Sequence, residues 1–395
     1  MRQAIMTLDE QNQLLVDVEA FCQEIRPIEE LCYLEHRFND QVIPLAARHR
    51  LLGMLVPIEY GGRGADAVSY SKALARIGQE GTGVRTLFSG HTSIGQVPLM
   101  TWGNAPQKQR FLPATVTGET IMAFGLTEPD AGSNPLELQM TYRRDGNRFL
   151  LNGVKYLISN GGIAGLIVTF AYPAAGNGRM SAFLVETNQP GFEREDLVAK
   201  MGMPTCNTAM FELRDYPVPA ENLLGEEGNG FCIAMDTLIS GRLSVAAGCL
   251  GVIEDCLTEA LNYARERQQH GKAIGKHQLV QDHLAHIEIA RQATESIVMQ
   301  AAAAKAASTQ EPDNPALHER ADLLVAEAKF FAANAAWDAA DRAVQVLGGR
   351  GYSDLYRPSR HLKDVRVCRI YEGTDEILRL KIAAALLGKE FEAFK

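Results

Sequence analysis

The sequence predicts a mainly α-helical protein with a central β region. Apolar residues recur at helical spacing in the first third and again from about residue 229, while short β-branched and aromatic runs separated by Gly and Pro lie between. The chain has 395 residues, more than one ordinary hydrophobic core requires. We predict an N-terminal helical domain over 1–118, a middle β-barrel or sandwich over 119–228 and a C-terminal four-helix bundle over 229–395.

The N-terminal region carries helix signals. Thr7 and Glu10 have the spacing of a capping box, in which each side chain binds the other residue's backbone amide at a helix start. Helical periodicity returns over Val68–Gly78 and from Gly83 to about Gly95.

The middle region has the pattern of short strands. Arg148–Gly153 predicts a strand that runs into a turn at Asn-Gly, with Val154–Ser159 continuing in extended conformation. Further strands are expected over Leu166–Tyr172, Met180–Glu186 and Ala209–Leu213.

The last third predicts long helices. We expect one over Asp236–Gln269 that stops at Gly271, followed by Gln278–Ala307 and His318–Leu347 with a polar loop Ser308–Pro315 between them, and a short final helix over Lys381–Leu387. Long antiparallel helices joined by short loops are typical of a four-helix bundle.

Composition and charge exclude several classes of partner. The net charge is −9 and the isoelectric point is near 5.6, whereas nucleic-acid binding needs a basic surface, so no nucleic-acid partner is expected. No uninterrupted apolar stretch is long enough to span a bilayer, so we expect no membrane insertion. The first residues lack the apolar core of a signal peptide.

The sequence has none of the common motifs for disulfide chemistry, metal binding, dinucleotide binding or a nucleophilic serine. Seven scattered cysteines form no CxxC pair, which favours buried reduced thiols and a cytoplasmic protein. No HExxH is present, so no metal site is expected, and GxGxxG after a strand and GxSxG are missing as well.

Residues 124–134, FGLTEPDAGSN, break an apolar run with a turn. Pro129 presets a turn dihedral and Gly132 permits positive φ, while Thr127 and Ser133 supply hydroxyl groups that can face a ligand. A polar loop between two strands is the plain alternative. The tract resembles the flavin-contacting signature of the acyl-CoA dehydrogenase family.

Near the C-terminus, Tyr371-Glu372-Gly373-Thr374 places a carboxylate beside an aromatic ring and a glycine. Desolvation would raise the pKa of such an acid and make it a competent general base. An exposed acid before the last helix is the alternative. With Gln345 and the following glycines upstream, the arrangement resembles the second signature of the same family, which places its catalytic glutamate at this point.

Two more segments are similar to family motifs. Arg267-Gln-Gln-His-Gly-Lys272, followed by Gln278, resembles an RxxFGK segment that binds the FAD of a neighbouring subunit, with His270 in place of phenylalanine. Leu151–Asn160 resembles NGxKxWITN, with Ser159 in place of threonine and Leu157 in place of tryptophan.

The resemblance implies a fold of the same three domains, a homotetramer, and electron transfer from an acyl-CoA substrate through FAD to an electron-transfer flavoprotein. Glu372 would be the catalytic base, removing the α-proton while hydride leaves the β-carbon for flavin N5. The implied FAD contacts are Leu126, Thr127, Gly132, Ser133, Leu157, Ile158, Ser159, Arg267, His270, Gln278, Gln345, Gly349, Thr374 and Glu376. The implied substrate contacts are Arg85, Ser89, Ser133, Arg242, Tyr371 and Gly373.

The acyl group is indicated by Arg85, the one formal charge in Thr82–Met100. A structural interpretation is an ion pair or a side chain that reaches solvent. By resemblance, Arg85 and Ser89 align with the residues that glutaryl-CoA dehydrogenases use for the distal carboxylate, so the protein is most like the short-chain and glutaryl-CoA types. Alternatives are a straight short- or medium-chain dehydrogenase, a flavin-dependent oxidase, a carrier-protein thioester as substrate, and a non-catalytic scaffold.

Overall fold

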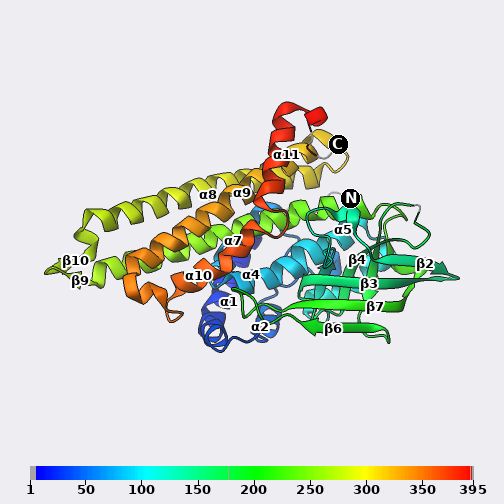
Figure 1. Ribbon diagram of the computed structural model, residues 1–395, viewed down its shortest axis with the longest axis horizontal. Helices are drawn as coiled ribbons and strands as arrows, with labels where there is room; N and C mark the ends of the chain where they lie inside the picture. The colour runs from blue at the N-terminus through cyan, green and yellow to red at the C-terminus, as the bar shows by residue number, and fades with distance from the viewer. Residues whose placement is uncertain (1–5, 177, 392, 394–395) are drawn as a thin grey trace.

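The computed structural model describes residues 6–176, 178–391 and 393. Helices form the first and last parts of the chain and strands lie between them, so the predicted mainly α fold with a central β region is confirmed (Figure 1). The sheet lies at one end of an elongated molecule, and the long C-terminal helices extend away from it (Figure 1).

The N-terminal part is helical. Its elements are α1 (Leu8–Leu34), α2 (Val42–Arg48), the 3₁₀ turn η1 (Ile58–Tyr60), α3 (Ala67–Gly78), α4 (Thr82–Phe88), the π-helical segment η2 (Ser89–Gln96), α5 (Val97–Trp102) and α6 (Ala105–Thr117). The predicted capping box is confirmed, because the Glu10 amide donates to the Thr7 hydroxyl at 3.3 Å and the Thr7 amide donates to the Glu10 carboxylate at 2.7 Å. Helix α6 was not foreseen from the sequence.

The middle part is an eight-stranded sheet. Its strands are β1 (Met122–Gly125), β2 (Thr141–Asp145), β3 (Arg148–Ser159), β4 (Leu166–Pro173), β5 (Ser181–Glu186), β6 (Phe192–Asp196), β7 (Thr208–Pro219) and β8 (Leu223–Leu224). The order is β6-β7-β3-β2-β4-β5-β8, and β1 pairs in parallel with β4. Alternate residues along β4 and β5 enter two apolar cores, one within the sheet and one shared with α5, α6 and α7.

The turn predicted at Asn152-Gly153 is wrong, because β3 continues through this dipeptide as one strand. Its pairing with β7 shifts register between Leu151 and Gly153, as at a β-bulge. Gly153 has φ +144°, and a Cβ there would lie 2.8 Å from the Met140 Cα. The glycine therefore allows a close approach of β3 to the segment before β2, not a chain reversal.

Three long helices dominate the C-terminal part. They are α7 (Gly230–Glu266), α8 (Gln278–Gln310) and α9 (Pro315–Leu347), and the short hairpin β9 (Gln268–Gln269) and β10 (Lys272–Ala273) joins the first two. Helix α7 therefore begins earlier and ends earlier than predicted, and α8 extends three residues into the predicted 308–315 loop. The 3₁₀ turns η6 (Gly348–Tyr352) and η7 (Arg366–Arg369) flank α10 (Arg357–Val365), and α11 (Asp375–Leu387) follows.

Helix α7 is a core helix of this fold. By length and composition alone it could cross a membrane, contrary to the expectation that no stretch was long and apolar enough, but 89% of its most apolar window is buried inside the protein. Near its start, Cys232 is exposed, so the expectation that all seven cysteines are buried is wrong for this one.

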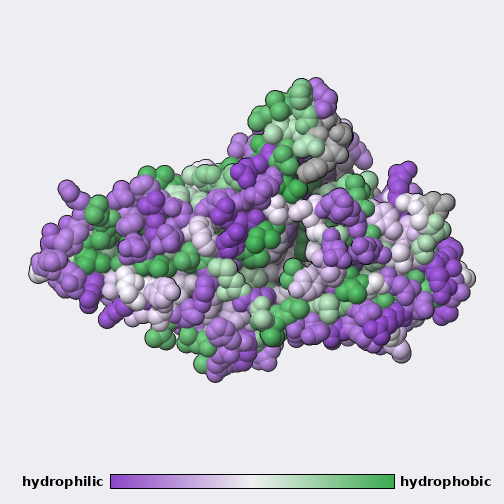
Figure 2. Space-filling model, in the orientation of Figure 1, coloured by the Kyte–Doolittle hydropathy of each residue, from purple (hydrophilic) through white to green (hydrophobic). Residues whose placement is uncertain are grey.

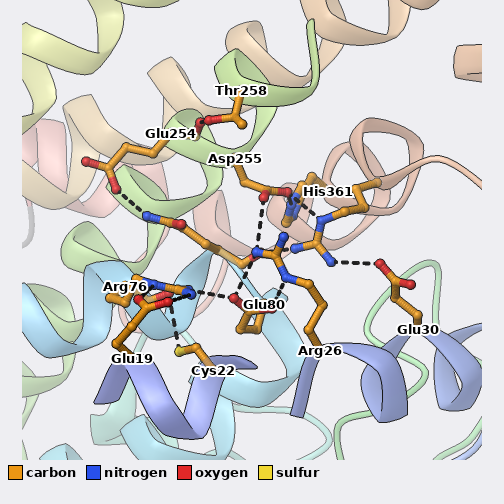
Figure 3. A network of polar contacts seen from close by, with 12 residues as sticks. Glu19, Cys22, Arg26, Glu30, Arg76, Glu80, Glu254, Asp255, Thr258 and His361 are labelled. Carbon is orange, nitrogen blue, oxygen red and sulfur yellow. Dashed lines mark hydrogen bonds and ion pairs between the residues drawn. The ribbon is translucent and has the colours of Figure 1, made fainter. Parts of the chain in front are cut away.

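A buried network of charges joins the N-terminal helices to the C-terminal ones (Figure 3). Asp255 of α7 lies at its centre and accepts hydrogen bonds from Arg357 Nε and His361 Nε2, each at 2.7 Å. Arg26 of α1 is 3.6 Å from Asp255 and binds Glu80 at 2.7 Å. Ion pairs therefore fix α1, the end of α3, α7 and α10 relative to one another.

Candidate active site

Glu372 lies in the short connection between η7 and α11, with its carboxylate against α7. Its φ is +54° and that of Gly373 is +97°, so two successive residues have left-handed backbone conformations. A Cβ placed on Gly241 would lie 2.0 Å from Glu372 Oε2 and 2.7 Å from Ile94 Cγ2. The missing side chain of Gly241 therefore leaves the space that the carboxylate occupies.

The environment of Glu372 favours an acid that titrates near neutrality. Oε2 is shielded from solvent and has no hydrogen-bond partner among the described residues. Burial raises the pKa of Glu372 to about 7, against the opposing positive charges of Arg85, Lys329 and Arg242. Such a carboxyl group can hold or release a proton under physiological conditions, as a general base must.

Two buried cations hold the backbone of this connection. Arg242 of α7 donates from Nε to the Glu372 carbonyl at 3.0 Å, and Lys329 of α9 donates from Nζ to the Gly373 carbonyl at 2.6 Å. Arg242 also lies 3.4 Å from Asp322. Arg242, which was predicted to contact substrate, directly follows Gly241 in α7, and its Nε binds the backbone of Glu372.

Arg85 of α4 is buried without a carboxylate partner. Its side chain is 1% exposed, Nη2 donates to the Tyr371 hydroxyl, and its guanidinium lies 5.7 Å from the centre of that ring. Nη1 has no partner among the residues that the structure describes, and Arg85 makes no ion pair with any of them. The structural interpretation of Arg85, an ion pair or a side chain reaching solvent, is therefore wrong.

Arg85 belongs to a row of unsatisfied polar groups. Within the described chain, buried polar atoms without a partner include those of Thr82, Arg85, Thr86, Ser89 and Thr92, together with Ser244 of α7 and Glu372. Each of the first four has two of the others three or four residues away, so they share one face of α4 and the start of η2. Buried polar groups are normally hydrogen-bonded, so this cluster is a place where a bound polar ligand or water could supply the partners that the described residues do not.

The predicted flavin-contacting residues of the sheet lie together. The Thr127 carbonyl accepts from the Tyr156 amide at 2.9 Å, which sets the 124–134 tract beside the end of β3. Buried Lys155 binds Glu128 at 2.7 Å, and Glu128 also accepts from the Met140 amide at 3.0 Å, so the tract is anchored. Leu157 is 53% exposed with φ +59°, an apolar side chain turned outward from a strand.

These sheet residues adjoin the row on α4 and η2. The Asn160 amide group donates to the Leu87 carbonyl at 3.1 Å. A Cβ on Gly90 would lie 2.9 Å from the Asn160 side chain and 3.7 Å from that of Ser159. The predicted cofactor surface and the predicted substrate pocket therefore meet where η2 packs against the end of β3.

Other predicted cofactor residues lie far from this place. All five are exposed and lie at or just beyond helix ends, at the tip of the bundle that carries β9 and β10: Arg267, His270, Gln278, Gln345 and Gly349 (Figure 1). Arg267 is 26 residues after Gly241, which corresponds to roughly 39 Å along a helix. One chain therefore cannot bring both groups of residues to the same ligand.

The remaining predicted contacts divide between buried and exposed positions. Leu126 and Ile158 are buried, whereas Gly132 and Ser133 lie on the exposed part of the 124–134 tract. Thr374 caps α11 by accepting from the Ile377 amide at 3.3 Å. Glu376 is exposed and pairs with Arg379 at 3.0 Å.

Lys329 is the site residue that the sequence analysis missed. Its position continues the buried stripe of α9, with Val325, Ala332 and Ala336 on the same face. A single lysine within an apolar stripe is the signal that could have identified it, because a buried ammonium group requires a partner.

Comparisons with known proteins show the family of this chain. Models of the acyl-CoA dehydrogenase N-terminal, middle and C-terminal domains match residues 8–119, 123–216 and 228–387. An acyl-CoA dehydrogenase of Bacillus subtilis (strain 168) is 40% identical over 93% of this chain and 94% of its own length.

Two solved structures are similar over nearly the whole chain. Butyryl-CoA dehydrogenase from Megasphaera elsdenii superimposes with a TM-score of 0.90 at 33% identity, covering 97% of this chain and 99% of that one. A glutaryl-CoA dehydrogenase in complex with glutaryl-CoA gives a TM-score of 0.89 at 30% identity, covering 99% and 98%. The chain belongs to the acyl-CoA dehydrogenase family and is an oxidoreductase with FAD as its cofactor.

Proposed function

We propose that this chain dehydrogenates a short acyl-CoA thioester, with Glu372 as the base that removes the α-proton. The observation that carries the proposal is the shielded, unpartnered Oε2 of Glu372 in the gap left by Gly241, where burial raises the pKa to about 7. The backbone amide of Glu372 is the proposed donor to the thioester oxygen, where negative charge develops as the proton leaves.

The residues around η2 and β3 fit FAD. Thr127, Ser133 and Ser159 offer hydroxyl groups, and exposed Leu157 offers an apolar contact for a flat ring. When bound, FAD supplies the acceptor for the hydride that leaves the β-carbon. Because Arg267 and Gln278 lie at the other end of the bundle, we assign them to the FAD of a neighbouring subunit.

The acyl chain that fits best carries a distal carboxylate. Nη1 of Arg85 and Oγ of Ser89 are buried without partners among the described residues, and an isolated buried guanidinium is costly unless an anion joins it. A carboxylate on the far end of a short acyl group would supply that anion. We therefore propose a substrate of the glutaryl-CoA type, with an uncharged short acyl-CoA such as butyryl-CoA as the alternative.

We further propose a homotetramer that passes electrons to an electron-transfer flavoprotein. Apolar side chains gather on α11, where Leu380, Leu386 and Leu387 are exposed (Figure 2). Exposed apolar side chains on one helix favour contact with another protein surface. The distal position of the second group of predicted FAD residues likewise supports the proposed partner subunit.

The test is anaerobic mixing of the FAD-loaded protein with glutaryl-CoA and, separately, with butyryl-CoA. Loss of the oxidised-flavin absorbance should be faster with glutaryl-CoA in wild type, and Glu372→Gln should abolish it with both substrates. Arg85→Gln should remove the preference for glutaryl-CoA. Bleaching that persists in Glu372→Gln would contradict the assignment of the base.

The same sample distinguishes a dehydrogenase from an oxidase. After bleaching, admission of air should restore the absorbance slowly, whereas added electron-transfer flavoprotein should restore it quickly. Rapid recovery in air alone would favour the oxidase alternative.

A further inference from the structure

Lys329 has the character of a functional residue, although it touches no group that reacts. It is fully buried in α9, and its Nζ donates to the Gly373 carbonyl at 2.6 Å. It makes no ion pair with any residue that the structure describes. Its neighbours on the buried face are Val325, Ala328, Ala332 and Ala333. An apolar side chain would fill this space without the cost of desolvating an ammonium group.

The carbonyl that Lys329 binds belongs to a backbone segment in an unusual conformation. Glu372, which is not glycine, has φ +54°, and Gly373 follows at +97°. A non-glycine residue keeps such a conformation only where its surroundings hold it there. The holding groups are Arg242 from α7, on the Glu372 carbonyl, and Lys329 from α9, on the next carbonyl.

We propose that Lys329 is a positioning residue for the base: its ammonium group fixes the Gly373 carbonyl and so keeps the Glu372 carboxylate in the gap beside Gly241. The proposal rests on the function proposed above for Glu372. Losing this contact frees the Gly373 carbonyl, which Arg242 does not hold, and the carboxylate can then leave the gap.

The charge of Lys329 has a second effect on the same group. Burial raises the pKa of Glu372 and the nearby Cys368 thiol adds to this rise, whereas the positive charges of Arg85, Lys329 and Arg242 oppose it. Neutralising Lys329 should therefore move the titration of Glu372 to higher pH, whereas the titration would stay in place if Lys329 served only to fill space.

Three substitutions separate charge from hydrogen bonding. Lys329→Arg keeps both, Lys329→Gln keeps a donor without charge, and Lys329→Met keeps only the volume of the chain. Arg320→Gln, which removes an exposed cation from the same helix, is the matched control. Lys329→Gln also keeps the test available if Lys329→Met does not fold.

The first measurement needs no turnover. The infrared carbonyl stretch of protonated Glu372 is isolated by subtracting the spectrum of the same protein carrying Glu372→Gln, and it is followed against pH in the FAD-loaded protein. We expect the midpoint to rise by at least about half a pH unit in Lys329→Gln and Lys329→Met, and to stay in place in Lys329→Arg and Arg320→Gln. Equal midpoints in all variants would contradict the proposal that the charge of Lys329 lowers the pKa of Glu372.

The second measurement is anaerobic flavin reduction by whichever of butyryl-CoA and glutaryl-CoA reduces wild type faster. The maximal rate should fall at least tenfold in Lys329→Met and less in Lys329→Gln, with apparent substrate affinity changed less than threefold. Equal rates in Lys329→Met and wild type, or an equal loss in Lys329→Arg and Lys329→Met, would overturn the positioning role. If neither thioester reduces the flavin of the wild-type protein, the proposed function is contradicted instead. The infrared titration would then still decide whether Lys329 acts on Glu372.

Discussion

The carboxylate of Glu372 occupies the space where a side chain on Gly241 would lie. An added Cβ at Gly241 would approach Oε2 to 2.0 Å and the carboxyl carbon to 2.6 Å, distances that real structures do not tolerate. The two residues come from α7 and from the connection before α11, 131 positions apart in the chain. Their fit depends on how the connection before α11 packs against α7.

Gly241→Ala should therefore displace the predicted base without unfolding the protein. The carboxylate must move away from the methyl group, and a displacement of about 1 Å at a reacting group costs on the order of a hundredfold in rate. We expect kcat/KM to fall by that order in steady-state assays. FAD content and Tm should stay near wild type, and a large loss of either would mean that the substitution acts on folding.

The rate of flavin reduction should depend on pH through Glu372. Burial raises the pKa of Glu372 to about 7, so the protonated, inactive form prevails below that pH. We expect kcat/KM to increase with pH and to level off above neutrality. Because Arg85 opposes the effect of burial, Arg85→Gln should move the acid limb to higher pH; an acid limb near pH 4 in wild type would contradict this environment.

Parts of the fold and of the candidate site were predictable from the sequence because their signals are local. The capping box of Thr7 and Glu10, the turn-rich 124–134 tract and the Tyr371–Thr374 motif each lie within a few neighbouring residues. The order of helical and β regions follows from hydrophobic periodicity in the same way. The structure brings the 124–134 tract beside β3, as the grouping of the predicted FAD contacts requires.

Other features depend on contacts between distant elements and leave no local signal. Asn152-Gly153 has turn chemistry, but the nearby backbone of Met140 and the pairing with β7 make it part of a strand. Arg85 could have had an ion-pair partner anywhere in the chain, and only the packed structure places Tyr371 there instead. The proposed role of Lys329 likewise depends on its hydrogen bond to the Gly373 carbonyl, 44 residues away in the chain.

Gly248 provides room for the buried side chain of Arg85. A Cβ at Gly248 would lie 2.7 Å from Arg85 Nε and 2.8 Å from its Cδ. Gly248→Ala should therefore shift the guanidinium and weaken recognition of a distal carboxylate. We expect the ratio of kcat/KM for glutaryl-CoA over butyryl-CoA to fall by about tenfold, since charge-assisted hydrogen bonds contribute about 1.5–3 kcal/mol. An unchanged ratio would argue against Arg85 as the residue that binds the distal carboxylate of the acyl group.

The charged network around Asp255 predicts a large effect on stability. The carboxylate is 3% exposed and bound by Arg357 and His361, with Arg26 nearby (Figure 3). Asp255→Asn would leave buried positive charge without its counterion, and breaking such a pair costs about 3–5 kcal/mol. Urea unfolding should show a loss of that size. Asp338→Asn, which removes the more exposed partner of Arg342, should cost less than about 1 kcal/mol.

The difference between wild type and Asp255→Asn should also depend on pH. Burial alone would raise the pKa of Asp255, but Arg357 and His361 hold it well below its usual range. A carboxyl group with a lowered pKa in the folded state stabilises that state above its unfolded pKa of about 3.9, and this contribution is lost as the pH falls. The free energies of unfolding of the two proteins should therefore differ most at neutral pH and converge in acid. A difference that stays constant from neutral pH down to about pH 3 would mean that the asparagine acts through packing and not through the lost charge.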